Sequence, residues 1–200
     1  MKTKILPVIT IFIFFISSAN AQTKGQYMLG GNGFYSNSSS KTPSYGASVQ
    51  LGKVVKDNFV IGVTGGYFRY AYPVDSTNSR QVNFGVFIRK YKSISGKFSF
   101  FFQPDATYST YKTIANGLTS RFQNVTIGVT PGISYAISKC FQMELIMPDP
   151  VFISYMSQTY FDNSGQMLKI KNHVFSASVN LNQSLLTNFG LGFKFFIGKR

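Results

Sequence analysis

The feature that most constrains this chain is a two-residue alternation of side-chain character. It is clearest over residues 124–137, where the odd positions are mostly large and apolar and the even positions are small or polar. Because successive side chains of a β-strand point to opposite faces, the pattern predicts a strand with one apolar face. The stretch is longer than a typical globular strand of about 5–6 residues. It is long enough for a tilted membrane strand, which needs about 9–11 residues.

Other segments repeat the alternation, at 59–64, 82–89, 98–108 and 189–197. Their second face carries Gly, Ser, Thr and Asn, and only 13% of the chain is charged, whereas the usual share is about 25%. Small polar groups suit an enclosed lumen, with the apolar face turned to lipid. In lipid every backbone polar group must be paired, so spanning strands must close into a ring. We therefore predict an all-β protein, a closed antiparallel transmembrane β-barrel, with a soluble periplasmic β-protein as the alternative.

The spacing of the strands supports a barrel. Eight strand regions are expected, at 25–35, 44–52, 58–71, 81–91, 97–111, 122–137, 140–158 and 173–197. The links at 36–43, 72–80, 112–121 and 159–172 are long, and those at 53–57, 92–96 and 138–139 are short. Outer-membrane barrels have long external loops, short periplasmic turns and an even strand number. Pro148 and Pro150 predict a bend in their strand, and the length of the last region leaves ten strands as an alternative.

The first 21 residues have the pattern of a secretory signal peptide. Lys2 and Lys4 precede a short apolar run from Ile5 to Ile16, and small residues follow up to Ala21. The run is shorter than the roughly 20 residues of a spanning helix, so we expect cleavage before Gln22. Residues 22–200 would then form an exported barrel domain. The single cysteine, Cys140, excludes an internal disulfide, and we expect it to be a small apolar filler.

Tyrosines gather near the long-link ends of the strands. This group comprises Tyr35, Tyr45, Tyr67, Tyr70, Tyr72, Tyr108, Tyr111, Tyr155 and Tyr160. Such a distribution is typical of an aromatic girdle, where a ring meets acyl chains and its hydroxyl meets headgroups. The alternative is the ordinary β-propensity of tyrosine, which predicts no preference for one end.

The chain is basic, with 20 Lys and Arg against 6 Asp and Glu. Cations lie in or beside the long links, and these are Lys41, Arg80, Lys112, Arg121, Lys169 and Lys171. Others mark the opposite strand ends, and these are Lys53, Lys56, Lys90, Lys92, Lys97, Lys139, Lys199 and Arg200. Cations at both interfaces fit outer-membrane lipids or lipopolysaccharide as partners, and solubility charge on exposed loops is the alternative. Because the cations are scattered and no nucleic-acid-binding motif is present, we expect no nucleic acid partner.

Four charged residues fall on inward faces of the predicted strands: Arg89, Asp105, Glu144 and Lys194. Buried charges in membrane proteins normally pair, so we expect a salt-bridge network that fills the lumen. Eight strands leave room only for side chains or one small ligand, whereas diffusion pores use about 16–18 strands. A narrow channel for small solutes or ions remains the alternative.

A lipid-modifying enzyme is a further alternative. A hydrolase would need a nucleophile and a base within reach, and the candidates are His173, Ser176, Ser178 and Glu144. Because His173 and Ser176 are three residues apart, a regular strand places them on opposite faces. We therefore predict no enzymatic activity, and the sequence calls for neither a metal nor a cofactor.

Three glycine-punctuated segments carry a family resemblance. They are Leu29-Gly30-Gly31-Asn32-Gly33, Ile61-Gly62-Val63-Thr64-Gly65-Gly66 and Phe189-Gly190-Leu191-Gly192-Phe193-Lys194-Phe195-Phe196. Over about residues 25–197 the chain resembles small outer-membrane β-barrel proteins of the porin-family or OmpA/OmpX-like kind. The resemblance implies the outer membrane of a diderm bacterium, insertion by the barrel-assembly machinery, and a structural or surface-interaction role through external loops, with no external ligand identified. Such proteins often end on an aromatic residue, whereas this chain ends Ile197-Gly198-Lys199-Arg200, so recognition by that machinery would use Phe195 and Phe196.

Overall fold

The computed structural model describes residues 22–36, 44–72, 77–115, 118–147, 151–161, 167–179 and 190–198. Ten strands lie in these ranges: β1 (Tyr27–Ser36), β2 (Ser44–Lys56), β3 (Phe59–Tyr72), β4 (Thr77–Ser95), β5 (Phe98–Ala115), β6 (Leu118–Ala136), β7 (Phe141–Ile146), β8 (Val151–Phe161), β9 (Met167–Val179) and β10 (Gly190–Ile197). In the ranges given, no helix has the length and apolar character needed to cross a membrane.

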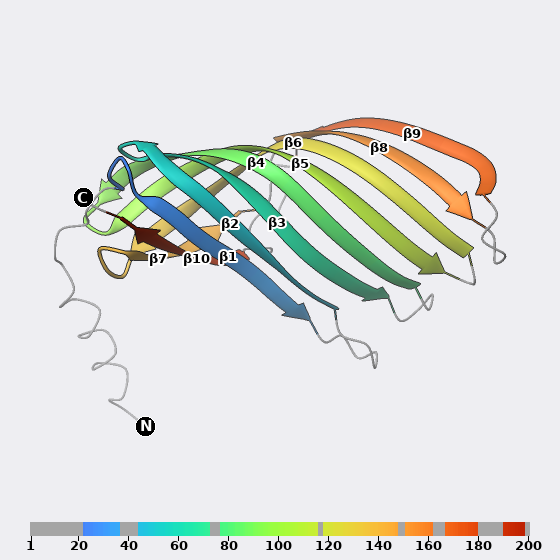
Figure 1. Cartoon of the computed structure of the whole chain (residues 1–200), viewed down its shortest axis with the longest axis horizontal. Coiled ribbons are helices and arrows are strands. Elements are labelled where there is room, and N and C mark those ends of the chain that lie inside the picture. The colour runs from blue at the N-terminus through green and yellow to red at the C-terminus, as the bar shows by residue number, and fades with distance from the viewer. Residues whose placement is uncertain are drawn as a thin grey trace, which may run out of the picture.

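Eight of the strands form a closed antiparallel ring. Its order is β1-β2-β3-β4-β5-β6-β7-β10, and β10 returns to β1. The closing pair aligns Tyr27 with Ile197 and Asn32 with Gly192. The prediction of an all-β, eight-stranded antiparallel barrel is therefore confirmed. Figure 1 shows β7 and β10 at one end of the barrel and β8 and β9 at the other.

The strands β8 and β9 extend the sheet from β6. The C-terminal part of β6, from Gly132 to Ala136, pairs with β7, and its N-terminal part, from Thr119 to Val129, pairs with β8. Two of the expected single strands, 140–158 and 173–197, are thus each divided in two. The first division falls between Ile146 and Val151, and Pro148 and Pro150, where a bend was expected, lie outside the described ranges. The second falls at residues 180–189, which lie outside the described ranges.

The strands also extend further into the expected long links than the sequence indicated. β4 begins at Thr77, β5 ends at Ala115, β6 begins at Leu118 and β9 begins at Met167. The expected boundaries in these links were therefore wrong. These segments contain the β-branched residues Thr77, Thr113, Ile114, Thr119 and Ile170, which favour strands. The β5–β6 ladder continues to the pair Ala115 and Leu118. As a result, cations expected in loops lie on strands.

The alternation assigns each strand a lumen face and an outer face. On β4 the outward Phe84, Val86 and Ile88 are 60%, 53% and 43% exposed, whereas the inward Phe87 and Arg89 are each 1% exposed. Glycines on inward faces make room for rings. A Cβ at Gly132 would overlap Cζ of Phe101, and one at Gly62 would lie 2.5 Å from Cζ of Phe87.

Cys140 is not an apolar filler. It is exposed in the turn between β6 and β7, and its Sγ lies 3.5 Å from the Ser138 hydroxyl oxygen. The turn lies at the rim of the barrel, so its side chains project away from the lumen. The expectation was wrong because a tight turn exposes residues whatever their polarity.

Candidate functional site

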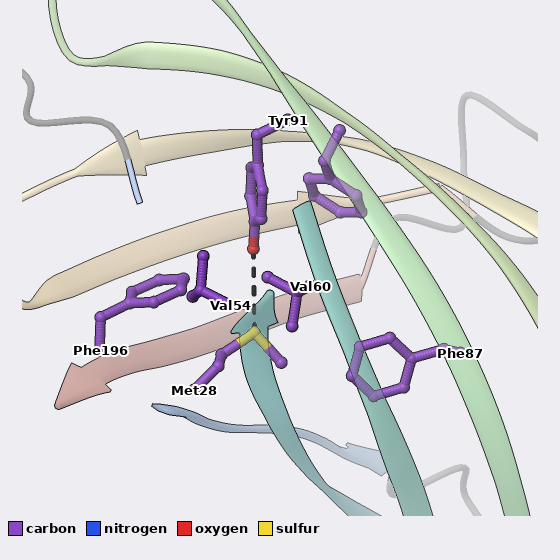
Figure 2. Close-up of a cluster of buried hydrophobic side chains, with 7 residues drawn as sticks. Met28, Val54, Val60, Phe87, Tyr91 and Phe196 are labelled. Carbon is purple, nitrogen blue, oxygen red and sulfur yellow. Dashed lines mark hydrogen bonds between the residues drawn. The ribbon is translucent and has the colours of Figure 1, made fainter. Parts of the chain in front are cut away.

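An apolar layer fills the lumen near the end that carries the short turns. It consists of Met28, Val54, Val60, Phe87, Tyr91, Phe101 and Phe196, all at most 3% exposed. Figure 2 shows these side chains converging from several strands toward the barrel interior. The hydroxyl of Tyr91 points at the thioether sulfur of Met28, 4.0 Å away. These side chains therefore form one packed apolar cluster in the described part of the lumen.

A charged layer adjoins the apolar one. Glu144 on β7 contacts two cations: its Oε1 lies 2.7 Å from Nη1 of Arg89 on β4, and its Oε2 lies 3.1 Å from Nζ of Lys194 on β10. All three side chains are 1% exposed. The hydroxyl of Tyr91 donates to the same carboxylate at 3.1 Å. One acid therefore joins the two sides of the barrel across its lumen.

Asp105 joins this layer indirectly. The Arg89 guanidinium donates from Nε to Oε1 of Gln103 at 2.8 Å, and the Gln103 amide donates to Oδ2 of Asp105 at 3.3 Å. The Thr130 hydroxyl also donates to that carboxylate oxygen, at 3.2 Å. The structure thus brings Arg89, Glu144 and Lys194 into direct ion pairs and places Asp105 one amide away.

Sequence reasoning missed the neutral members of the network. Gln50 accepts from Nη2 of Arg89 at 3.1 Å, and Gln103 and Tyr91 bridge the charged groups. Their inward position could have been read from the alternation on their strands. What a single sequence does not reveal is which of many inward polar residues lie at the same height.

Aromatic rings connect the apolar and charged layers. The guanidinium carbon of Arg89 lies 4.4 Å from the ring centre of Phe101, and 5.7 and 5.8 Å from those of Phe87 and Tyr91. Cation–π contacts of this kind are strongest where the cation is desolvated.

In the described ranges, no group of three or more His, Cys, Asp and Glu side chains could hold a metal ion.

Another feature of the lumen is a pocket toward the end of the barrel that carries the long links. It has a volume of about 190 Å³ and is lined by Tyr111, Thr113, Phe122, Asn124 and Met156. The amide of Asn124 donates to the Thr126 hydroxyl at 3.0 Å, while its buried Oδ1 has no hydrogen-bond partner in the described part of the chain. Among the described residues, the lumen therefore holds buried layers near the turn end and a pocket toward the other end.

The predicted tyrosine girdle is only partly on the outer face. Tyr67, Tyr108 and Tyr155 are outward and 43%, 45% and 48% exposed. Tyr70 and Tyr111 face the lumen instead: Tyr70 is opposite the buried Ser79, and Tyr111 lines the pocket described above. These two assignments were wrong because a girdle residue needs the outward parity as well as the right height. The side chain of Tyr72 lies outside the described residues.

The candidate headgroup cations divide in a similar way. Arg80, Lys112 and Arg121 are exposed on the outer face of β4, β5 and β6. Lys169 and Lys171 lie on β9, with side chains outside the described residues, and Lys41 lies outside the described ranges altogether.

The residues considered for catalysis are not assembled. The Tyr155 hydroxyl and Nδ1 of His173 are 2.7 Å apart, and their rings are stacked with centres 5.9 Å apart. Ser176 is instead hydrogen-bonded to Ser154, with 2.6 Å between the hydroxyl oxygens. Glu144 is held by its two cations. As expected, His173 and Ser176 lie on opposite faces of β9.

Comparison with known proteins yields similarity in solved structures alone, since no protein-family profile and no curated protein matches the sequence. Neisserial surface protein A is 13% identical, with a TM-score of 0.49, over 88% of this chain and 98% of that one. The N-terminal β-barrel domain of Pseudomonas aeruginosa OprF is 13% identical, with a TM-score of 0.47, over 89% and 100%. Ail, the attachment invasion locus protein of Yersinia pestis, is 12% identical, with a TM-score of 0.42, over 86% and 100%. This chain is thus similar to small outer-membrane β-barrel proteins, and its own closed ring of eight strands rests on the pairings described above.

Proposed function

We propose that this chain is a small outer-membrane β-barrel protein with a lumen sealed by side chains, and that its role is structural or lies in surface interaction through its external hairpins. The observation that carries the proposal is the Arg89–Glu144–Lys194 network, buried in the lumen directly beside the apolar layer. A sealed barrel offers its outer wall and its hairpin ends to other molecules, and no passage between the two sides.

The outer wall supports a membrane location. Along β5 the outward residues from Phe98 to Tyr108 are mainly apolar, and Phe98, Phe102 and Tyr108 are 46%, 48% and 45% exposed. This span is about 34 Å along the strand, or about 25 Å along the barrel axis at a tilt of about 40°. An apolar band of about 25 Å is the height expected of an outer-membrane barrel. In water, such a continuous apolar surface would favour aggregation.

The filled interior argues against the narrow channel. Ions need a hydrated path, whereas the side chains of the charged layer and of the apolar layer are almost fully buried. Eight strands give an interior that side chains can fill completely. The pocket lined by Tyr111, Phe122 and Met156 includes no residue of either layer, so it gives no support to a path through them.

The geometry gives no support to a lipid-modifying enzyme. A serine hydrolase would need the His173 ring within hydrogen-bond reach of a serine hydroxyl, and that ring contacts Tyr155 instead. A phenol and an imidazole at the outer end of the wall suit an interfacial anchor, since both have an apolar body and a polar edge.

Fractionation and conductance test the proposal. The full-length protein, expressed in a diderm host, is expected to sediment with the outer membrane and to migrate differently on a gel before and after boiling. Reconstituted in a planar bilayer, it is expected to give no current steps, beside a general porin as positive control. Recovery from the soluble periplasm would contradict the membrane location, and reproducible current steps would favour the channel. Lipid hydrolysis that is lost in His173→Ala would favour the enzyme.

A further inference from the structure

Four cations stand in one row across adjacent strands. Arg69 on β3 is directly opposite Arg80 on β4, Arg80 is opposite Lys112 on β5, and Lys112 is opposite Arg121 on β6. The ladder continues from Arg121 to Thr159 on β8, and from Thr159 to Lys171 on β9. We call Arg69, Arg80, Lys112 and Arg121 the cation row. In the sequence Arg69 falls in an expected strand, Arg80 ends one expected link, and Lys112 and Arg121 bound the next, and the register of β3 to β6 aligns all four.

The row lies on the outer face of the wall. Arg80, Lys112 and Arg121 are exposed, and Arg69 is half-buried, with its Nε donating to Oδ1 of Asn78 at 3.4 Å. The guanidinium of Arg121 lies 5.0 Å from the ring centre of Phe161. A guanidinium that lies over a ring can still direct its N–H groups, which lie in the guanidinium plane, at an anion.

No acidic side chain balances the row in the described part of the chain. Of the acids described there, Asp57 lies in the turn between β2 and β3, while Asp105 and Glu144 face the lumen. Like charges directly opposite each other on neighbouring strands are destabilising. Among the described residues the row therefore lacks a counter-charge, and anions bound between its cations would relieve their repulsion.

The height of the row identifies where such anions would come from. Lys112 is four residues beyond Tyr108, the end of the continuous apolar outward run of β5, and Thr110 lies between them, while a further apolar residue, Ile114, is exposed on the same face beyond Lys112. Four residues correspond to about 13 Å along the strand and about 10 Å along the barrel axis. Headgroups extend several ångströms beyond the hydrocarbon on each side, so long Arg and Lys side chains in this row lie at the level of lipid phosphates.

We propose that the cation row binds the phosphate groups of outer-leaflet lipids, and that it binds a glycolipid with two phosphates more tightly than a lipid with one. Four neighbouring strands span about 14 Å at about 4.8 Å per interval, which gives each of two phosphates a pair of cations. Arg is well suited to this because its planar fork binds phosphate oxygens in a bidentate way. The inference rests on the proposed function, since it requires the hairpin end of the barrel to lie in the outer leaflet.

The test is a binding measurement on the full chain folded in zwitterionic detergent micelles. The probes are diphosphorylated lipid A, its monophosphorylated form, phosphatidylglycerol and inorganic phosphate, and binding is measured by native mass spectrometry. The variant replaces Arg80, Lys112 and Arg121 with Gln. The matched control replaces Lys53, Lys90 and Lys92 with Gln, which removes the same charge from exposed positions toward the other end of the wall.

Diphosphorylated lipid A is expected to bind most tightly, and the row variant is expected to bind it about a hundredfold more weakly, with the control variant unchanged. An equal loss of affinity in both variants would overturn the proposal, because any surface cation would then serve. Unchanged affinity in the row variant would also overturn it, because the row would then take no part in binding. Inorganic phosphate binding as tightly as the lipid would overturn the lipid as the source. A gel shift on boiling is checked first, so that failure to form a barrel is distinguished from failure of a folded barrel to bind.

Discussion

At the scale of single residues, Glu144 has the most demanding position in the molecule. It is the one carboxylate in direct contact with Arg89 and Lys194 among the described residues, and all three are almost completely buried. The desolvation of buried charges is costly unless each is paired. The barrel therefore depends on this side chain because its loss leaves two cations uncompensated in the lumen.

Replacement of Glu144 with Gln is expected to destabilise the barrel by about 3–5 kcal/mol, as is typical when one partner of a buried ion pair is removed. The measurement is the urea midpoint of unfolding, followed by the gel shift on boiling. The control is Asp57→Asn, which makes the same charge change at an exposed turn and is expected to shift stability by less than about 0.5 kcal/mol. A midpoint for Glu144→Gln equal to that of the wild type would show that the network is not a stabilising element. Adding Lys194→Met to Glu144→Gln is expected to recover part of the loss.

At the scale of elements, the outward face of a strand changes its environment along its length. On β6 the outward Ile127 is 59% exposed within the apolar band, and the outward Gln123, four residues away, is exposed near the cation row. If the wall lies in a bilayer, the two positions face hydrocarbon and headgroups respectively. A charge should therefore cost different free energies at the two sites.

An arginine at position 127 is expected to reduce the free energy of folding into lipid vesicles by about 2–4 kcal/mol, whereas one at position 123 is expected to change it by about 0–1 kcal/mol. Urea titrations of both single variants in the same vesicles give the comparison. Since both substitutions add the same side chain to the same face of one strand, equal effects would argue that β6 does not cross hydrocarbon.

At the scale of the whole molecule, the barrel is held closed by its first and last strands. β1 and β10 are about 160 residues apart in the chain and pair over six positions, from Tyr27–Ile197 to Asn32–Gly192. This seam completes the ring and holds Lys194 beside the other two members of the charged network. Closure and filling of the lumen are therefore coupled.

A disulfide can report on this closure. In a Cys140→Ser background, cysteines at positions 29 and 195 are directly opposite each other and are expected to form a disulfide under mild oxidation. The crosslinked chain should migrate faster on a denaturing non-reducing gel. Cysteines at positions 29 and 191 are out of register and serve as the control. Crosslinking that is as efficient in the control would argue against the register of the seam.

The sequence by itself determined the class of fold and the face of most residues. Period-two alternation fixes which side of a strand each side chain occupies, so the inward Arg89, Glu144 and Lys194 could be predicted before their contacts were known. Closure of the ring followed from the expectation that strands in lipid leave no edge unpaired, and its eight members followed from the number of alternating regions. Two kinds of inference were wrong. Tyr70 and Tyr111 face the lumen and not the outside, and several strands continue beyond their expected ends. Both errors lie near strand ends, where polar residues interrupt the hydrophobic alternation.

Only the tertiary structure decided which residues of different strands lie at the same height. The register between two strands depends on their turn and on the ladder hydrogen bonds. The offsets of successive strand pairs add up around the ring, so the alternation within one strand cannot predict them. Hence Gln103 and Tyr91 join the charged layer, Phe101 packs against Gly132, and Arg69 aligns with Arg80, Lys112 and Arg121. A chain that appears merely basic in sequence thereby presents a filled lumen and a row of cations on one part of its outer wall.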